Sequence, residues 1–329
     1  MNRIYQPKKK CLFCKGSLVK EEYAPLEIVR CLNCGLYYRD VVDFSEGYYT
    51  DSSRYCCNFS DRNKMEARSR DARLRFDTIG KVIKVGRGKF LDIGANDGLC
   101  MWEASRRGFE VFGCEPNKFA FEEAKKYNFK ILASTFEEGF EELKKSGPFE
   151  LITMFHVLEH MVNPLETLIK IRGLMVPDSS WLVIEVPDIK SPISQIYRWE
   201  DLRINQEHLY YFDKHSLLLL LSQAGFKPVF LRRRVWDGMH QSLLANLIRL
   251  PMLSEGYLFL RRVKKGIKRY LGPKDAPRKT LMDNSELWLS QNRKVKEFYF
   301  FSCFFGWLVS LLNRGDDLLA ICKYETAGQ

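Results

Sequence analysis

Four cysteines near the start of the chain come in two pairs with the spacing of metal ligands. Cys11 and Cys14 form one C-x-x-C pair, and Cys31 and Cys34 form the other, with Gly35 directly after it. Thiolates at this spacing can complete a tetrahedral zinc site, and the metal would supply the folding energy of so short a segment. Because four thiolates leave no open position, we expect structural zinc; a redox-active cysteine pair is the alternative.

A second group of informative residues lies in the stretch Phe-Leu-Asp-Ile-Gly-Ala-Asn-Asp-Gly at 90–98. An apolar run ends in Asp92, and the backbone then turns on Gly94, Asn96 and Gly98. Gly and Asn tolerate positive φ and let a ligand approach the backbone closely. The pattern predicts a strand, a tight loop and a helix whose N-terminus faces the loop, which is typical of a nucleotide site.

The spacing of this loop indicates which nucleotide it binds. A dinucleotide fingerprint needs G-x-G-x-x-G, but Leu99 stands at the third glycine position and Gly98 comes one residue early. The spacing Gly94-x-Asn96-x-Gly98, with Asp92 two residues before the first glycine, resembles motif I of the class I methyltransferases, which bind S-adenosylmethionine. Asn96 stands where that motif usually has its second glycine. Glu115, at the end of the next apolar run, stands where such proteins hydrogen-bond the two ribose hydroxyls. An ordinary α/β turn without a ligand is the alternative.

Three of the five histidines fall in two short motifs, His156-Val-Leu-Glu159-His160 and Glu207-His208. An imidazole near its ordinary pKa is a serviceable base. We predict that His156 or His208, the latter with Glu207, acts as a base or positions the acceptor. A hydrogen-bonded structural role is the alternative, which we favour for His160. For Glu159 a salt bridge or helix cap weighs equally with a functional role.

The elements that must position these residues alternate along the chain. Strands are expected near 89–93, 111–115, 129–133, 149–155, 181–186, 229–233 and 317–323. Helices are expected near 61–85, 99–108, 119–127, 136–145, 163–176 and 214–224. The alternation predicts a parallel, doubly wound sheet with right-handed crossovers, whose ligands lie beyond the carboxyl ends of the strands. Ser134 and Phe136, in the turn after the third strand, are then candidates for the edge and face of an adenine.

Together the motifs resemble the class I methyltransferases that carry an N-terminal zinc-binding module, including the sugar C-methyltransferases and other surface-polysaccharide methyltransferases. The resemblance rests on the double C-x-x-C, the loop at 92–98, the motif at 156–160, Val-Pro-Asp at 186–188 and Glu-His-Leu-Tyr-Tyr-Phe at 207–212. It implies an α/β fold: a seven-stranded Rossmann-like sheet, a small zinc ribbon and a helical insertion before the last strand. It also implies methyl transfer to a sugar, a nucleotide-sugar or a lipid-linked glycan.

From these observations we expect S-adenosylmethionine and structural Zn²⁺ as cofactors. The residues predicted to bind the first are Asp92, Gly94, Asn96, Gly98, Glu115, Ser134 and Phe136. The expected domains are a zinc-binding module at 1–45, a linker and helix at 46–88, the methyltransferase core at 89–235, a basic and aromatic helical insertion at 236–314, and the last strand with a tail at 315–329.

The positive charge of the chain is concentrated in one segment. Between residues 226 and 280 fourteen Lys or Arg residues face three acids, and the net charge of the whole chain is +11. Such a segment indicates an anionic partner, such as lipid, nucleic acid or a phosphorylated substrate.

Residues 257–271 place apolar side chains on one face of a helix and basic side chains on the opposite face, as in a helix that lies on an anionic membrane. A cap on the sheet with solvated charges is the alternative. The apolar run at 298–312 is too short to span a bilayer.

The N-terminal ten residues are polar and basic and show no secretory signal, which predicts a cytoplasmic protein, with attachment to the inner face of the membrane as a further hypothesis. Ten cysteines in that compartment favour metal binding over disulfides.

Two other functions remain open. An RNA methyltransferase would bind phosphates with the zinc module and the basic segment, but the basic residues do not interleave with stacking aromatics as in an RNA-binding module. A non-catalytic zinc-stabilised scaffold would have no need of an intact nucleotide loop.

Overall fold

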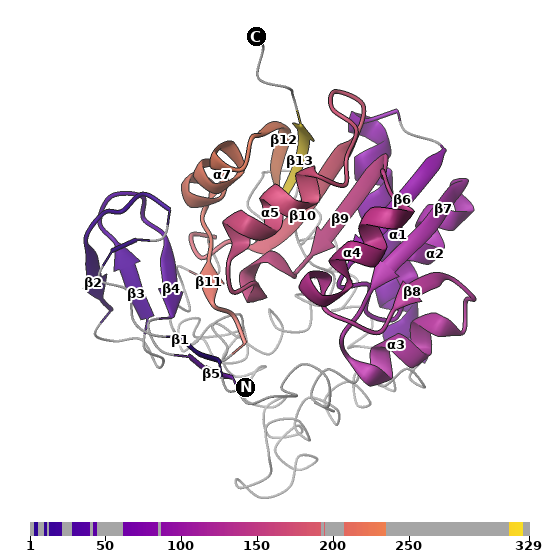
Figure 1. Ribbon diagram of the computed structural model, residues 1–329, viewed down its shortest axis with the longest axis horizontal. Helices are drawn as coiled ribbons and strands as arrows, with labels where there is room; N and C mark the ends of the chain where they lie inside the picture. The colour runs from indigo at the N-terminus through magenta and orange to yellow at the C-terminus, as the bar shows by residue number, and fades with distance from the viewer. Residues whose placement is uncertain are drawn as a thin grey trace, which may run out of the picture. The chain divides into compact units, whose positions relative to one another are not determined.

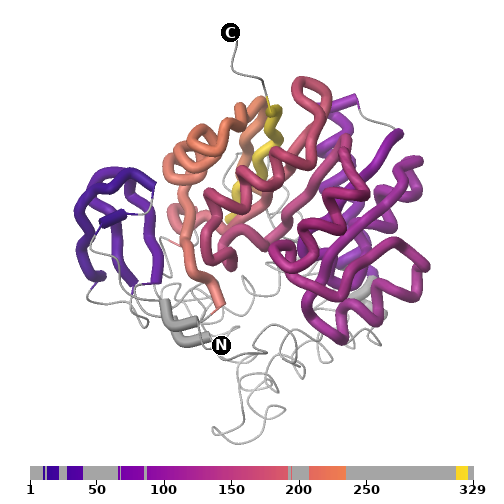
Figure 2. The backbone as a smooth tube through the Cα atoms, viewed as in Figure 1, coloured from indigo at the N-terminus to yellow at the C-terminus, as the bar shows by residue number. Residues whose placement is uncertain are grey.

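The structure is a computed structural model of the 329-residue chain. It describes residues 3–5, 10–11, 13–21, 28–39, 42–44, 62–84, 87–191, 194, 207–234 and 316–324, and the main body of these is coloured in Figure 2. The chain divides into two compact units, Met1–Arg234 with Arg314–Gln329, and Val235–Asn313. The second unit lies outside the described residues. So do the predicted insertion at 236–314, its basic helix at 257–271 and the apolar run at 298–312.

A seven-stranded sheet with the order β12-β13-β10-β9-β6-β7-β8 carries the first unit (Figure 1). Its strands are β6 (Gly88–Ile93), β7 (Phe109–Cys114), β8 (Lys130–Leu132), β9 (Leu151–Phe155), β10 (Trp181–Pro187), β12 (Phe226–Arg234) and β13 (Asp317–Tyr324). The pairs β8–β7, β7–β6, β6–β9 and β9–β10 are all parallel. The predicted seven-stranded α/β sheet is therefore confirmed.

The expectation of a wholly parallel sheet is wrong at one strand. β13 is inserted between β10 and β12 and runs antiparallel to both. Arg234 ends β12 and is the register partner of Asp317, which begins β13, and the Asp316 N–H donates to the Arg234 carbonyl. Because the chain re-enters the sheet beside the point where it left, the returning strand must run in the opposite direction.

Helices cover both faces of the sheet, as a doubly wound fold requires (Figure 1). They are α1 (Arg62–Val82), α2 (Leu99–Arg106), α3 (Lys118–Lys125), α4 (Phe136–Ser146), α5 (Pro164–Arg172) and α7 (Lys214–Gln223), with a short 3₁₀ helix η2 (Leu158–His160). Side chains of α1 and α2 share one buried cluster with alternate strand residues, and side chains of α4, α5 and α7 share the other. None of the helices within the described ranges has the length and apolarity needed to cross a bilayer.

Polar caps explain where several helices begin. Asn117 and Asn163 accept hydrogen bonds from the first turns of α3 and α5, and Pro164 occupies the first turn of α5, as its sequence predicted. Thr135 and Asp213 each complete a capping box at the start of α4 and α7.

The cysteine-containing segment forms a second sheet with the order β11-β4-β3-β2. Its strands are β2 (Leu18–Lys20), β3 (Ile28–Cys31), β4 (Tyr37–Arg39) and β11 (Tyr210–Tyr211), while β1 (Arg3–Tyr5) pairs separately with β5 (Val42–Phe44). β11 belongs to the motif at 207–212 and pairs antiparallel with β4. The N-terminal module therefore supports the segment that carries His208.

Candidate functional site

The site lies where the direction of the chain across the sheet reverses. Strand β6 is flanked by β7 on one side and by β9 on the other. From β6 the chain adds β7 and β8 toward one edge of the sheet, and then returns to add β9 and β10 toward the other edge. In open α/β sheets ligands bind in the crevice outside the carboxyl ends of the strands at this switch point. Because β6, β7 and β9 are parallel, the loop after β6, Glu115 after β7 and His156 after β9 all follow the carboxyl ends of their strands at this edge.

The loop after β6 has the backbone that its sequence predicted. Gly94, Asn96 and Gly98 have φ values of 75°, 49° and 77°, all in the left-handed region. A Cβ added at Gly98 would lie 3.1 Å from the Cβ and 3.2 Å from the Cα of Ala124, so the loop and α3 approach too closely for a side chain. The N–H groups of Gly94 and Ala95 donate to the Cys114 carbonyl, which fixes the loop on β7.

Glu115 is held against this loop by backbone donors. Its two carboxylate oxygens accept hydrogen bonds of 2.8 Å from the N–H groups of Asn96 and Asn117. Burial raises the pKa of Glu115, while these two hydrogen bonds act in the opposite direction. A carboxylate oxygen has more than one acceptor direction, so both oxygens keep the capacity to bind a pair of ribose hydroxyls. This arrangement fits the nucleoside of S-adenosylmethionine.

Asp92 lies deeper, at the end of β6, with 3% of its surface exposed. Thr153 on β9 donates a 2.6 Å hydrogen bond to its Oδ1. Burial raises the pKa of Asp92 to about 7, although the Thr153 hydroxyl lowers it. The carboxyl group therefore titrates near neutral pH, which makes it sensitive to a cation bound next to it.

Of the two residues predicted for the adenine, Phe136 is buried and Ser134 is half-buried. Phe136 begins α4 and packs edge-on against Phe140, with ring centroids 5.7 Å apart. The Ser134 hydroxyl and the Asn96 Oδ1 are buried without a hydrogen-bond partner in the part of the chain that the structure describes. Unsatisfied polar atoms at the edge of the site fit a polar ligand, and the assignment of Ser134 and Phe136 to adenine stays a prediction.

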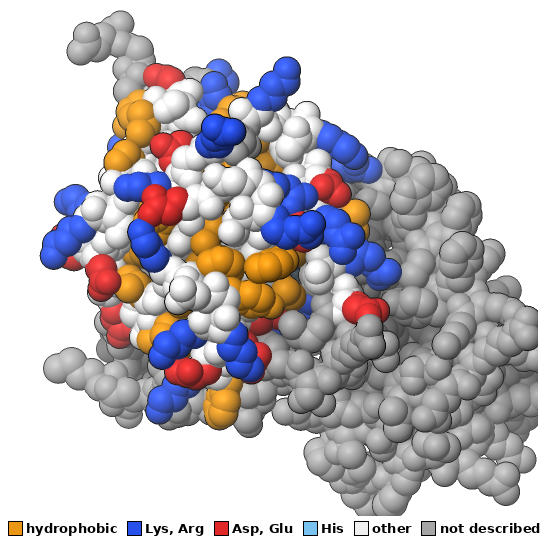
Figure 3. Space-filling model, turned by 90° about the vertical axis from the view of Figure 1, so that its right-hand side faces the viewer, with side chains coloured by type: hydrophobic (Ala, Val, Ile, Leu, Met, Phe, Trp, Pro, Cys, Tyr) orange, Lys and Arg blue, Asp and Glu red, His pale blue; other side chains and the backbone are white. Residues whose placement is uncertain are grey.

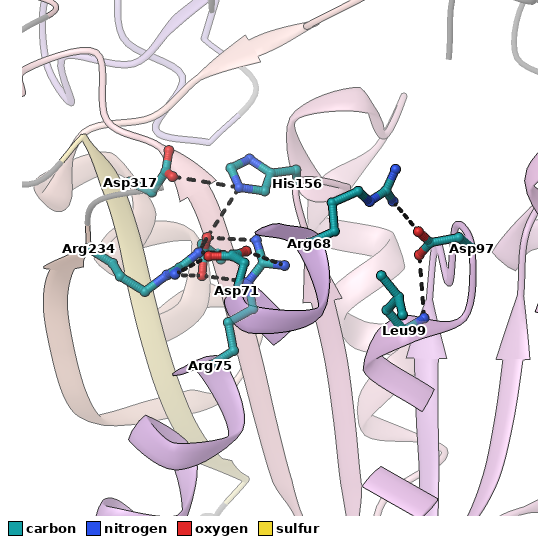
Figure 4. Close-up of polar contacts among 9 residues, drawn as sticks. Arg68, Asp71, Arg75, Asp97, Leu99, His156, Arg234 and Asp317 are labelled. Carbon is teal, nitrogen blue, oxygen red and sulfur yellow. Dashed lines mark hydrogen bonds and ion pairs between the residues drawn. The ribbon is translucent and has the colours of Figure 1, made fainter. Parts of the chain in front are cut away.

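The sequence did not indicate that α1 is tied to the loop. Arg68 on α1 forms a 2.9 Å ion pair with Asp97, whose other oxygen accepts from the Leu99 N–H at the start of α2 (Figure 4). Asp97 stands between Asn96 and Gly98, so this pair ties the loop to α1.

His156 follows β9 with a φ of 57°, a backbone conformation rare for a residue with a side chain. Its Nε2 lies 3.2 Å from Glu185 and 3.7 Å from Asp317, and its Nδ1 lies 3.6 Å from Glu159. Burial lowers the pKa of His156, but these carboxylates, Asp317 first, outweigh burial and raise it to about 10. At neutral pH the ring is an imidazolium, which favours the positioning role over that of a base.

A buried ion network that the sequence did not predict includes Asp71, Arg75 and Arg234, which are labelled in Figure 4, and is centred on Glu185. Arg75 on α1 and Arg234 on β12 each donate two hydrogen bonds to its carboxylate, at 2.7–3.2 Å. Asp71 on α1 pairs with both arginines. Burial opposes ionisation, but the two guanidinium groups hold the pKa of Glu185 well below its usual range. One signal was present in the sequence: a single acid inside the apolar strand at 181–186.

The motifs at 156–160 and 207–212 lie next to each other in space. Both supply candidates for the base or for the group that positions the acceptor. His160 Nδ1–H donates to the Glu207 carbonyl at 2.9 Å, and the Leu209 N–H donates to the Glu159 carbonyl at 2.8 Å. The His208 and His160 rings meet edge-on with centroids 4.7 Å apart, and His208 Nε2 lies 3.9 Å from Glu159 Oε1. The structure therefore brings His156 and His208 to the same carboxylate.

The four cysteines of the N-terminal module converge. The Sγ atoms of Cys11 and Cys34 are 3.5 Å apart, and those of Cys14 and Cys31 are 3.4 Å apart. All four thiols are free, and their sulfurs lie within 4.8 Å of one another. A tetrahedral zinc–thiolate site with 2.3 Å bonds places its sulfurs about 3.8 Å apart, so this cluster fits zinc closely.

The module contacts the segment that carries His208. Phe13, between Cys11 and Cys14, stacks on Tyr210 with ring centroids 5.9 Å apart, and its carbonyl accepts from Gln223 at 2.7 Å. The Arg39 N–H donates to the Leu209 carbonyl. These contacts join the module to the segment that carries His208.

A family profile and a curated relative each match part of this chain. A profile of the family described as "Methyltransferase domain" matches residues 62–230, just over half of the chain. The chain is 27% identical over 145 residues to the tRNA U34 carboxymethyltransferase of Histophilus somni, across 42% of this chain and 45% of that protein's length.

Among solved structures, a S-adenosylmethionine-dependent methyltransferase from Archaeoglobus fulgidus is 18% identical with a TM-score of 0.45, covering 78% of this chain and 94% of that one. A plantazolicin methyltransferase is 14% identical with a TM-score of 0.47, covering 83% and 95%. With the profile match spanning α1 to β12 and the nucleotide loop, the chain belongs to the methyltransferase domain family as a class I S-adenosylmethionine-dependent methyltransferase.

Proposed function

We propose that this enzyme methylates a small or glycan-linked acceptor: a sugar, a nucleotide-sugar or a lipid-linked glycan. The observation that carries the proposal is the polar rim beside the nucleotide loop, where His156, Glu159 and His208 converge. Carboxylate and imidazole groups suit an acceptor rich in hydroxyl groups. The motif resemblance to sugar methyltransferases supports the same class of acceptor.

S-adenosylmethionine supplies a methyl group activated by its sulfonium sulfur. The residues of this chain hold the donor and acceptor in line, which can account for much of the barrier reduction. Glu115 would bind the ribose, and the backbone from Gly94 to Gly98 would line the nucleoside. His156, charged and fixed by Glu185, would orient the acceptor. Glu207 and His208 occupy the same rim and are the remaining candidates to receive a proton where the acceptor must lose one.

The test is an acceptor search with labelled S-adenosylmethionine. The purified enzyme is incubated with an extract of the source cell, which is then separated into lipid, nucleotide-sugar, RNA and protein fractions. We expect label in the nucleotide-sugar or lipid fraction, and none from a Glu115→Gln variant. Label confined to RNA or protein would refute the proposed acceptor.

A tRNA acceptor is the second candidate, and one observation favours it. The relative from Histophilus somni is named as a tRNA U34 carboxymethyltransferase. The net charge of +11 and the Lys and Arg side chains around a hydrophobic patch in Figure 3 suit a polyanionic partner. Retention of tRNA that weakens steeply with salt, together with label in the RNA fraction, would establish this candidate.

We further propose a cytoplasmic location with peripheral attachment to anionic membrane through residues 257–271. The amphipathic pattern of that segment supports the proposal. Flotation with vesicles of anionic phospholipid at low salt tests it, and an enzyme that stays at the bottom of the gradient would refute it.

A further inference from the structure

A compact group of metal-binding side chains lies next to the nucleotide loop. One ligand atom from each of Glu159, His160 and His208 lies within 4.8 Å of the others. Two imidazoles and one carboxylate are the ligand set of catalytic zinc sites and of non-haem iron sites, in which other coordination positions stay open. Unlike the four-cysteine cluster, this group could therefore bind a metal and a substrate together.

The buried carboxylate of Glu159 is the second observation. Glu159 has 0% of its surface exposed, and neither of its oxygens has a hydrogen-bond partner in the described part of the chain. The nearest ionisable groups are His156, with its Nδ1 at 3.6 Å, and His208, with its Nε2 at 3.9 Å, both beyond hydrogen-bond length. A buried carboxylate without hydrogen bonds is costly, and a bound cation would remove that cost.

The surroundings of His160 are those of a metal ligand. Its Nδ1–H donates to the Glu207 carbonyl at 2.9 Å. Ligating histidines commonly donate their other N–H to a backbone carbonyl, because this orients the ring and keeps the lone pair on the ligating nitrogen. The hydrogen bond from the Leu209 N–H to the Glu159 carbonyl likewise holds the two ligand-bearing segments together.

A neighbouring group of similar composition does not qualify. His156, Glu185 and Asp317 also bring three potential ligand atoms within 4.8 Å. Glu185, however, already accepts four hydrogen bonds from Arg75 and Arg234, so two cations occupy its carboxylate. The two groups differ in that the carboxylate of Glu159 faces imidazoles and, among the residues that the structure describes, no arginine.

We propose that Glu159, His160 and His208 bind one divalent metal ion, and that its open positions bind hydroxyl oxygens of the acceptor. This proposal rests on the proposed function, which it deepens by assigning an oxygen acceptor. The ion lowers the pKa of a bound hydroxyl. Because His208 is then a ligand and cannot take the proton, the proton passes to Glu207 or to solvent. The oxygen then forms a bond to the methyl carbon as the carbon–sulfur bond breaks, and that electron pair stays on the sulfur of S-adenosylhomocysteine.

Zinc content measures the site directly, because Zn²⁺ binds such ligands more tightly than Mn²⁺ or Fe²⁺ does. Wild-type protein and the variants Glu159→Gln and His215→Gln are dialysed against Zn²⁺ at about 10 μM and analysed by mass spectrometry. His215 is an exposed histidine at the start of α7, away from the group, and serves as the matched control. We expect Glu159→Gln to hold one equivalent less than the other two proteins. Equal zinc in all three would overturn the proposal.

A measurement on the wild type removes dependence on one variant. A mercurial that modifies thiols should release the cysteine-bound zinc and leave one equivalent that only a chelator removes; if none remains, the proposal fails. Should Glu159→Gln not fold, His208→Gln must lose the same equivalent of zinc.

Titration with S-adenosylhomocysteine separates a failure of the proposed function from a failure of the proposed metal site. A wild-type protein that does not bind it contradicts the proposed function, whereas binding without a second zinc contradicts only the metal site.

Discussion

Replacing Glu115 by Gln should weaken the binding of S-adenosylhomocysteine about a hundredfold. The carboxylate accepts two 2.8 Å hydrogen bonds from the Asn96 and Asn117 N–H groups and is placed to accept two more from ribose hydroxyls. A glutamine turns its NH₂ group toward one of these donors and removes the negative charge. Hydrogen bonds to a charged group contribute about 1.5–3 kcal/mol each, so the loss of one and the weakening of another cost about 3 kcal/mol of binding free energy.

Isothermal titration calorimetry of the full-length protein measures this effect. Glu110→Gln is the matched control, because Glu110 lies on the same strand, has a side chain that is 48% exposed and pairs only with surface Lys130 among the described residues. Glu110→Gln should bind as the wild type does. If Glu115→Gln bound within threefold of Glu110→Gln, the ribose contact and the location of the nucleoside would both be wrong.

Three further predictions concern stability. Gly98→Ala should lower the free energy of unfolding, measured in urea, by about 2 kcal/mol, because Gly98 has a φ of 77° and Ala124 leaves no room for a Cβ. Gly80→Ala is the control: Gly80 is exposed on α1 with open space around it, so this variant should be neutral or stabilising. The Asp92 carboxyl, with its pKa raised to about 7, binds a proton in the folded state from about pH 4 to 7. The contribution of Asp92 to the free energy of unfolding therefore falls as pH rises through that window, by up to about 4 kcal/mol. Between pH 5 and 8 the free energy of unfolding of Asp92→Asn should decline less steeply than that of the wild type. An equal slope for the two proteins would contradict the raised pKa. Cys34→Ser should lose one zinc per chain and become rapidly cleaved by trypsin within residues 10–39, and unchanged protease resistance would show that the module does not need its metal.

The nucleotide loop illustrates how much of the site is local. The spacing of Gly94, Asn96 and Gly98 required a backbone with positive φ, and all three residues have it. The position of Glu115 at the end of the next strand placed it beside that loop, because parallel neighbours end at the same edge. The caps at Asn163 and Asp213 also began their helices where polar side chains precede apolar periodicity.

The charged interior was not predictable in the same way. Glu185 lies 110 residues after Arg75 and 49 residues before Arg234, and neither spacing indicates that these side chains touch. They meet because β13 enters the sheet between β10 and β12 and because α1 packs over the same edge.

The sequence by itself determined the elements, the nucleotide loop and the cysteine pairs, since each depends on residues within a few turns of one another. The tertiary structure alone decided that β11 completes the sheet of the N-terminal module, that His156 is held by three carboxylates, and that Glu159 lies buried between histidines. Strand order fixes these contacts, and strand order follows from how the whole chain buries its apolar surface, a property that no local pattern encodes.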